Sequence, residues 1–263
     1  NFLGSDLIYV DKWPWVPEGD GEYEWWHFWR RPHPSINEYK FLSENSSQAT
    51  AMTIMANRGG LTFKRGSNSI KDATLQGASF GYQEIYDLEI EEGRFFSRIE
   101  VETGRNVCVI GANVADNLFP RGGDILGEEI KVKNTKYVVI GVIKREGESF
   151  LDTPSDDDIV VVPYGSFRKL YLTGTGSWRE TGSMIILKGR EDDIGLVELE
   201  NEVRGHMRRL RGLKPKDRGN FAMNRPEAIS NVIGGVFDVL TIAGWIIGSF
   251  SILVGGFGIA NIM

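Results

Sequence analysis

The end of the chain constrains its architecture most, because residues 239–263 contain no charged side chain. At ~1.5 Å per residue this run would form a helix of about 37 Å, which exceeds the roughly 30 Å hydrocarbon core of a bilayer. Apolar runs of about 10 to 14 residues are more typical of buried helices in soluble domains. A signal peptide stands at the N-terminus, whereas this run closes the chain and follows Asp238. We therefore expect a transmembrane helix over about 239–263.

Glycines recur within this apolar run, and Gly244 and Gly248 are followed by Gly255. Glycine weakens a helix in water, but in lipid small residues allow the backbones of neighbouring helices to approach closely. We therefore expect Gly244, Gly248 and Gly255 to pack against other membrane helices.

The apolar run also continues a longer predicted helix. Pro226 is well placed as the first residue of a helix, because its missing N–H would be unpaired there in any case. Only the pair Gly234 and Gly235 is expected to disturb this helix, as a kink. A rod over 226–263 would be roughly 57 Å long. Such a rod could carry motion between the membrane and the domain outside it.

The composition of the chain excludes several functional classes. Charged residues make up 25% and hydrophobic residues 41%, as in ordinary folded domains. The net charge of −6 argues against a nucleic-acid partner, which requires a dense basic face. Cys108 is the single cysteine, so an intramolecular disulfide is excluded. His27 and His33 stand in an irregular segment without further ligands nearby, so we expect no metal, and without nucleotide-binding motifs we expect no cofactor.

Strand, helix, strand units are predicted at both ends of the chain. The first unit comprises 6–10, 36–45 and 51–56, with Ser35 and Glu38 at the spacing of a capping box. The second unit comprises a strand over 184–187, a helix that begins at Asp192 or Asp193 and ends at Gly212, and a strand over 220–223. Between them, two short strands are expected over 61–76, and the apolar runs 107–110 and 159–162 predict strands buried on both faces.

Tryptophans gather in the irregular segment 11–34. Clustered aromatic side chains dominate the energetics of interfaces. The residues Trp25, Trp26, Phe28 and Trp29 are therefore a candidate partner-binding or membrane-surface patch. The alternative is a loop that folds these rings onto the body of the domain.

A serine-hydrolase motif is present in the phrase Gly77-Ala78-Ser79-Phe80-Gly81, which matches G-x-S-x-G. That motif requires a preceding strand, a following helix and a later histidine. His206 is the only histidine downstream, and it lies on the predicted amphipathic helix. A membrane-tethered serine hydrolase using Ser79 is thus a second hypothesis, and a tethered adhesion or binding module using the tryptophans is a third.

Several short motifs follow one another in a distinctive order. They are Glu92-Gly93-Arg94-Phe95-Phe96, Val109-Ile110-Gly111, Leu118-Phe119, Asp124-Ile125-Leu126-Gly127 and Val138-Val139-Ile140-Gly141-Val142. In order and spacing they resemble the MacB-like periplasmic core domain of ABC transporter permeases. The final residues, 251–263, are similar to the start of the FtsX-like permease segment that follows this domain in the family.

The resemblance implies an α+β fold with two subdomains. A porter-like subdomain would be formed by both chain ends, 1–58 and 178–225, from their strand, helix, strand units. A sabre-like α/β subdomain, 59–177, would be inserted between them. A stalk helix over 226–263 would then run into the transmembrane helix.

The resemblance also implies a function. The chain would be an extracytoplasmic, mostly periplasmic part of a permease in the bacterial inner membrane, which transmits ATP-driven conformational change and contacts substrate or adaptor proteins. Its partners would be a second, identical or related permease, a cytoplasmic ABC ATPase, fused or separate, a periplasmic adaptor and an outer-membrane channel. No catalytic residues are implied, and ATP hydrolysis would belong to another domain or subunit.

Overall fold

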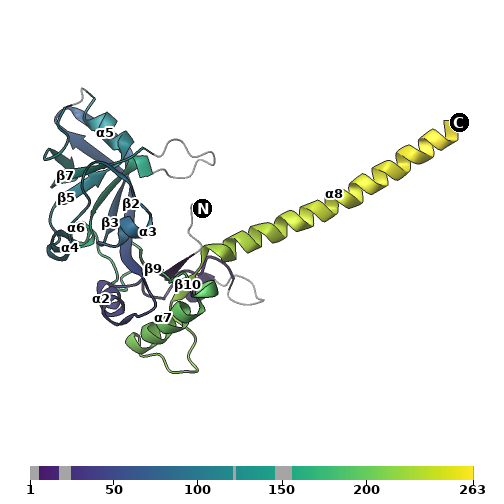
Figure 1. The fold of residues 1–263 in the computed structure, drawn as a ribbon, viewed down its shortest axis with the longest axis horizontal. Helices are drawn as coiled ribbons and strands as arrows, with labels where there is room; N and C mark the ends of the chain where they lie inside the picture. Colours follow the sequence, from purple (N-terminus) through teal and green to yellow (C-terminus); the bar gives the residue numbers. More distant parts are fainter. Residues whose placement is uncertain (1–5, 18–24, 121–122, 146–155, 263) are drawn as a thin grey trace.

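A computed structural model describes residues 6–17, 25–120, 123–145 and 156–262 (Figure 1). The strands are β1 (Leu7–Asp11), β2 (Ala51–Arg65), β3 (Asn68–Ala78), β4 (Ile90–Gly93), β5 (Val107–Ile110), β6 (Glu129–Val132), β7 (Thr135–Ile143), β8 (Ile159–Pro163), β9 (Ser183–Lys188) and β10 (Ala222–Asn224). The α-helices are α1 (Trp25–Phe28), α2 (Ile36–Asn45), α3 (Tyr82–Ile85), α4 (Arg98–Thr103), α5 (Ala112–Leu118), α6 (Tyr164–Leu170), α7 (Val197–Leu210) and α8 (Pro226–Ile262). Two single-turn 3-10 helices are Asp156–Asp158 and Ile194–Leu196.

One sheet connects the whole folded body. Its strand order is β10-β1-β9-β2-β3-β8-β5-β7-β4, and β6 pairs with both β2 and β7. The first part of β2, 51–56, pairs with β9. Its later part pairs with β3 and reaches β6 through Phe63 and Lys64. Hydrogen bonds along β2 therefore join the strands near the chain ends to the strands formed by the middle of the chain.

Six of these strands close into a ring. Successive hydrogen-bonded neighbours lead from β2 through β3, β8, β5, β7 and β6 back to β2. Within such a ring a strand has a partner on both sides, so the ring offers no free edge for pairing with another chain. The side chains of Phe63 and Tyr137 are fully buried in this part.

Apolar side chains cover both faces of the sheet. In β5, Cys108 and Ile110 belong to one hydrophobic cluster, and Val107 and Val109 belong to the other. This two-sided burial explains the continuous apolar runs predicted as strands at 107–110 and 159–162, and both strands are confirmed. Burial raises the pKa of the Cys108 thiol, which stays protonated and packs as an apolar group.

The predicted units at the chain ends are also confirmed, with shifted boundaries. Ser35 Oγ accepts from the backbone N–H of Glu38 at 3.3 Å, and Glu38 Oε2 accepts from the N–H of Ser35 at 2.6 Å. The last strand, β10, begins two residues later than predicted, at Ala222. The predicted break before residue 61 is wrong, because register shifts between Arg58 and Phe63 absorb the irregularity and β2 continues.

The predicted subdomain boundaries lie at 58–59, inside β2, and at 177–178, before β9. Because the sheet is continuous across β2, hydrogen bonding does not mark a division there. The split into 1–58 with 178–225 and 59–177 stays a prediction.

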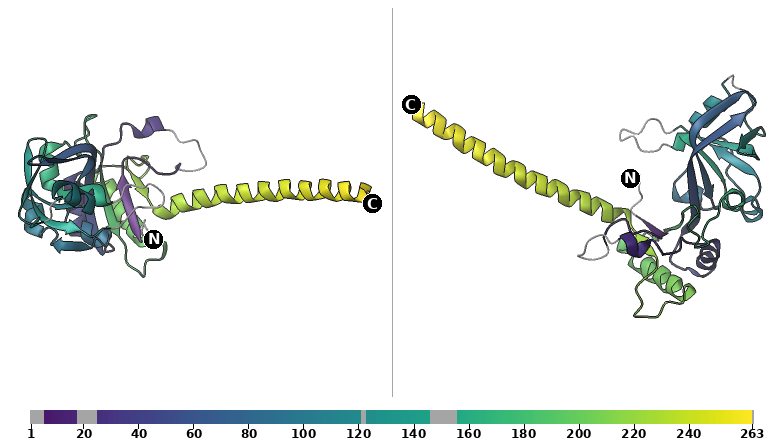
Figure 2. Two further views of the ribbon diagram at one scale, coloured as in Figure 1. Left: turned by 90° about the horizontal axis from the view of Figure 1, so that it is seen from above. Right: turned by 180° about the vertical axis from the view of Figure 1, so that it is seen from behind.

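Helix α8 begins at Pro226 as expected and runs through Gly234 and Gly235. It extends away from the folded body (Figures 1 and 2). Within the residues that the structure describes, no helix is both long and apolar enough to cross a membrane. The predicted transmembrane helix over about 239–263 is therefore not confirmed.

The connection from β4 to α4 explains the phrase Glu92-Gly93-Arg94-Phe95-Phe96. Gly93 has a φ of +81°, and a Cβ atom there would lie 2.3 Å from the carbonyl oxygen of Ile140. Only glycine therefore fits this crossing. Phe95 and Phe96 follow as buried anchors in the core.

A buried carboxylate stabilises the start of α4. Glu100 accepts hydrogen bonds from Arg94 Nη1 at 2.7 Å and Nη2 at 2.9 Å, and from the backbone N–H of Ser97 at 2.8 Å. Its side chain is only 5% exposed. The Arg94 guanidinium, followed by the Ser97 donors, lowers the pKa of Glu100 from 4.5 to about 2 against the opposing effect of burial.

We expect Glu100→Gln to lower the free energy of unfolding by about 2 kcal/mol at pH 7. Because the folded pKa lies below the unfolded one, this stabilisation is present above pH 4.5 and is lost as the pH falls toward 2. Urea denaturation at pH 7 and pH 3 measures it, with Glu102→Gln on the exposed face of α4 as the control. If the free energies of unfolding of variant and wild type differed by the same amount at both pH values, the lowered pKa of Glu100 would not account for the stabilisation.

Candidate functional site

A groove of about 800 Å³ is lined by residues of α2 and of the adjacent helices α4 and α6. Tyr39 and Ser43 of α2 line one wall, Val101 and Arg168 line the opposite wall, and Met52 of β2 lies between them. Its walls come from the predicted porter-like part on one side and the predicted sabre-like part on the other. Ligand sites are commonly concave spaces of this size between structural units.

Charges of both signs surround this groove. The charged residues of the lining include Lys40, Glu44, Glu84, Arg98 and Arg168. Among the described residues none of these five forms an ion pair. Burial raises the pKa of Tyr39, whose hydroxyl therefore remains a hydrogen-bond donor. The groove offers apolar surface together with unpaired cations and anions, so it can receive a ligand or a protein segment that carries both kinds of group.

Ser79 also lines the groove, but its surroundings do not activate it. Its hydroxyl accepts from the backbone N–H of Ile54 at 3.1 Å and lies 2.9 Å from the hydroxyl of Thr53. The side chain is 1% exposed, and the described lining of the groove contains no histidine. His206 lies on α7 against the ring of Phe41. Without a neighbouring base, the arrangement does not support the serine-hydrolase hypothesis.

Three tryptophans form an exposed surface, which we call the tryptophan face: Trp25, Trp26 and Trp29 are 55%, 52% and 61% exposed. Phe28 was predicted to belong to this surface, but it is 2% exposed and anchors α1 under the guanidinium of Arg31. The helical turn of α1 directs Phe28 inward and its neighbours outward. The partner-binding role of the exposed three stays a prediction.

Asn224, near the start of α8, holds the segment that contains Trp13 and Trp15, which we call the tryptophan segment. The side chain of Asn224 donates to the carbonyl of Trp13 at 2.8 Å and accepts from the N–H of Trp15 at 2.9 Å. Asn224 ends β10, two residues before α8 begins at Pro226. Figure 2 shows the segment with α1 on the side of the domain from which α8 leaves. The ring of Trp13 in turn lies 6.4 Å from that of Trp29, and this contact links the tryptophan face to the residues that Asn224 holds.

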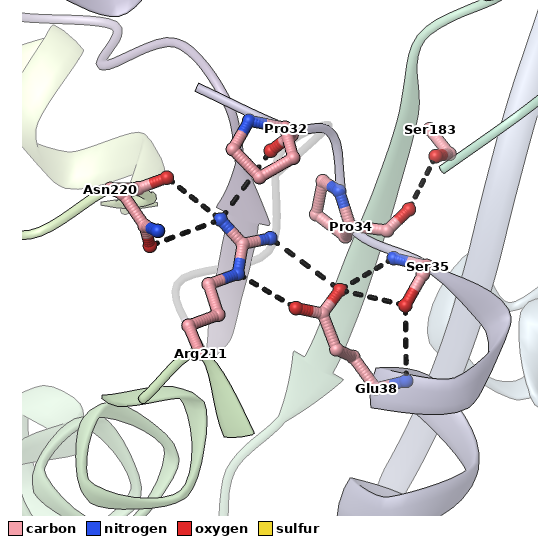
Figure 3. Close-up of polar contacts among 7 residues, drawn as sticks. All are labelled: Pro32, Pro34, Ser35, Glu38, Ser183, Arg211 and Asn220. Carbon is pink, nitrogen blue, oxygen red and sulfur yellow. Dashed lines mark hydrogen bonds and ion pairs between the residues drawn. The ribbon is translucent and has the colours of Figure 1, made fainter. Parts of the chain in front are cut away.

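A buried ion pair joins both chain ends near the same base (Figure 3). Arg211 donates from Nε to Glu38 Oε1 at 2.7 Å and from Nη1 to the carbonyl of Asn220 at 2.7 Å. The two charged side chains are only 6% and 13% exposed. Ser183 of β9 donates to the carbonyl of Pro34 at 2.6 Å beside this pair.

The Arg211–Glu38 pair connects the start of α2, the end of α7 and the segment that leads into β10 and α8. The sequence suggests only that Arg208, Arg209 and Arg211 favour the negative end of a helix dipole. The structure shows a more specific role for Arg211, whereas Arg209 lies on the surface near Phe41. The pair cannot be predicted from the sequence because its members are 173 positions apart.

The glycines predicted to pack in the membrane lie on the extended part of α8. A Cβ atom at Gly244 or Gly248 would meet nothing within 4 Å. Gly255 lies outside the residues whose surroundings are described. The packing of all three against partner helices stays a prediction.

The family relationship rests on residues 2–201, which match the sequence profile of the MacB-like periplasmic core domain. The chain belongs to this family. The macrolide export ATP-binding/permease protein MacB of Neisseria meningitidis serogroup A is 25% identical over 229 residues, covering 87% of this chain and 33% of the relative. The pyoverdine export ATP-binding/permease protein PvdT of Pseudomonas fluorescens is 27% identical over 264 residues, covering 99% of this chain and 36% of the relative. This MacB-like chain spans about a third of the length of these relatives.

Solved structures show the same α+β fold. The periplasmic region of MacB from Actinobacillus actinomycetemcomitans aligns with a TM-score of 0.64 at 18% identity, covering 88% of this chain and 94% of that one. The extracellular domain of the transporter YknZ from Gram-positive bacteria aligns with a TM-score of 0.58 at 17% identity, covering 79% and 96%. The predicted resemblance to the MacB-like core domain is confirmed.

We expect Arg211→Met to lower the free energy of unfolding by about 3 kcal/mol, because it leaves the Glu38 carboxylate buried without its cation. Chemical denaturation of the chain at pH 7 measures the change. Arg209→Met is the matched control, since it removes the same charge from the surface at the same helix end, and its effect should stay below about 0.5 kcal/mol. Equal effects of the two substitutions would contradict the role assigned to Arg211.

Proposed function

We propose that this chain is the extracytoplasmic domain of a bacterial ABC transporter permease and transmits ATP-driven conformational change to surfaces outside the inner membrane. Family membership supports this proposal, and so do the relatives named as export ATP-binding/permease proteins. The observation that carries it is the attachment of a 37-residue helix, about 55 Å long, directly to the strand at the edge of the sheet.

The base of α8 is suited to transmit motion because polar contacts fix it on several sides. Arg225 donates to the carbonyl of Gly195 and lies 3.7 Å from Glu200 of α7. Asn224 binds the tryptophan segment, and β10 pairs with β1. A displacement of α8 would therefore act on β10, on α7 and on Trp13 and Trp15 through hydrogen bonds. It would act on the tryptophan face through the contact between the rings of Trp13 and Trp29, whose centres are 6.4 Å apart.

In the proposed assembly the apolar part of α8, about 239–263, lies in the membrane, and Gly244, Gly248 and Gly255 face neighbouring helices. A second permease, identical or related, completes a dimer, and a cytoplasmic ABC ATPase, fused or separate, supplies the energy. The groove beside α2 is the surface that we assign to an exported substrate or to a periplasmic adaptor leading to an outer-membrane channel. The mixture of unpaired charges and apolar residues in that groove supports this assignment.

The tryptophan face favours an additional binding role. Trp25, Trp26 and Trp29 present amphipathic rings on the side of the domain from which α8 leaves, and tryptophan is enriched both in interface hot spots and at membrane surfaces. In the proposed permease these rings contact a partner protein or the membrane surface. A tethered binding module without an ATPase would use the same face but would not need a rigid α8.

We expect Ser230→Pro, within the first turns of α8, to uncouple the domain from ATP hydrolysis in the full-length permease. Proline removes a hydrogen bond and kinks a helix, at a cost of about 3 kcal/mol. Exposed Trp178 is replaced by a labelled cysteine in both permease copies of the dimer, and the distance between the two labels is measured with and without ATP. In the proline variant the ATP-dependent change in this distance should be lost while ATP hydrolysis continues. Ser230→Ala should behave as the wild type. If the proline variant showed the same distance change as the wild type, the proposed transmission of motion through α8 would be overturned.

A further inference from the structure

Three lysines surround a hollow of about 330 Å³ on the ring of strands. Lys64 belongs to β2, Lys131 belongs to β6, and Lys133 lies in the turn that follows β6. Half-buried Leu61 adds apolar lining, whereas Val132 is buried in the core. This hollow is separate from the groove beside α2 and from the tryptophan face, since it shares no residue with either.

The lysines repel one another across the strands. Lys64 is directly opposite Lys131, and Lys131 is in turn directly opposite Lys136 of β7. Side chains at directly opposite positions start about 5 Å apart, so like charges there destabilise a sheet. Glu129 neutralises Lys136 at 2.6 Å. Within the described part of the chain, Lys64, Lys131 and Lys133 have no ion-pair partner.

Lys133 adds backbone strain to this repulsion. Its φ is +51°, in the left-handed region that glycine and asparagine occupy more easily. Its ammonium lies 4.2 Å from the ring centre of Tyr171, and the guanidinium of Arg58 lies 6.0 Å from the same ring. The hollow therefore concentrates positive charge in a chain whose net charge is −6.

Protection of a sheet edge does not explain these lysines. Exposed lysines often keep an edge strand from pairing with another chain. However, β6 already has partners on both sides, β2 and β7. An anionic ligand would relieve the repulsion that the fold leaves uncompensated.

We propose that this hollow binds an acidic segment of a partner protein, whose Asp or Glu side chains neutralise the three lysines. The position of the hollow along β2 argues against lipid head groups as its ligand. Lys64 lies near the end of β2, roughly 40 Å along the strand from Ala51, which pairs with β9 near the base of α8. Figure 1 shows α8 leaving from that base and extending away from the folded body, which carries the three lysines. The apolar lining suits the methylene groups of acidic side chains.

Binding of a fluorescein-labelled hexaglutamate peptide to the full chain, measured by anisotropy at low salt, tests the proposal. The triple variant Lys64→Gln/Lys131→Gln/Lys133→Gln should weaken binding by roughly tenfold or more. Its melting temperature should rise or stay the same, because repulsion is removed. A fall in affinity without a loss of stability distinguishes a binding site from a structural role.

The control is Lys216→Gln, which removes one exposed positive charge outside the hollow. This variant should bind the peptide as the wild type does. Unchanged binding by the triple variant, or an equal loss in the control, would overturn the proposal. Two further probes separate other anions. Displacement of the peptide by equimolar pyrophosphate would favour a phosphate ligand, and triple-variant-sensitive binding to phosphatidylglycerol vesicles without peptide binding would favour a membrane; either result would also overturn it.

Discussion

Backbone hydrogen bonds along β2 hold this molecule together as one mechanical unit. The strand begins beside β9, among elements from both chain ends, and finishes between β3 and β6 in the closed ring. Ladder hydrogen bonds resist sliding, and a strand shared by two regions passes displacement from one to the other. The groove beside α2 is lined by residues from both of those regions.

At the starts of two helices the same combination of a capping box and an ion pair positions other segments of the chain. In α2 and in α4 a glutamate at the third helical position caps the preceding serine and binds an arginine: Glu38 binds Arg211, and Glu100 binds Arg94. A capping carboxylate already lies at the positive end of a helix, and an arginine fork completes its hydrogen bonds. The first pair secures the segment leading to α8, and the second secures the β4 to α4 connection.

The two proposed binding surfaces lie at different distances from the long helix. Asn224 at its base binds Trp13, whose ring contacts Trp29 of the tryptophan face, while the lysine hollow lies near the far end of β2. In a permease this arrangement would place an aromatic contact close to the moving helix and a charged contact far from it. The sheet between them would carry the motion, because no flexible linker interrupts the path from β10 through β1 and β9 to β2.

By itself the sequence determined the local elements whose signals lie within a few residues: the capping box at Ser35, the buried strand 107–110, and the start of α8 at Pro226. Motif order also identified the family. Only the tertiary structure decided which surfaces are available. It turned Phe28 inward, paired Arg211 with Glu38, and brought Lys64 opposite Lys131. These contacts join residues that are far apart in the chain or depend on strand register, and neither distance nor register is encoded in a local pattern of residue types.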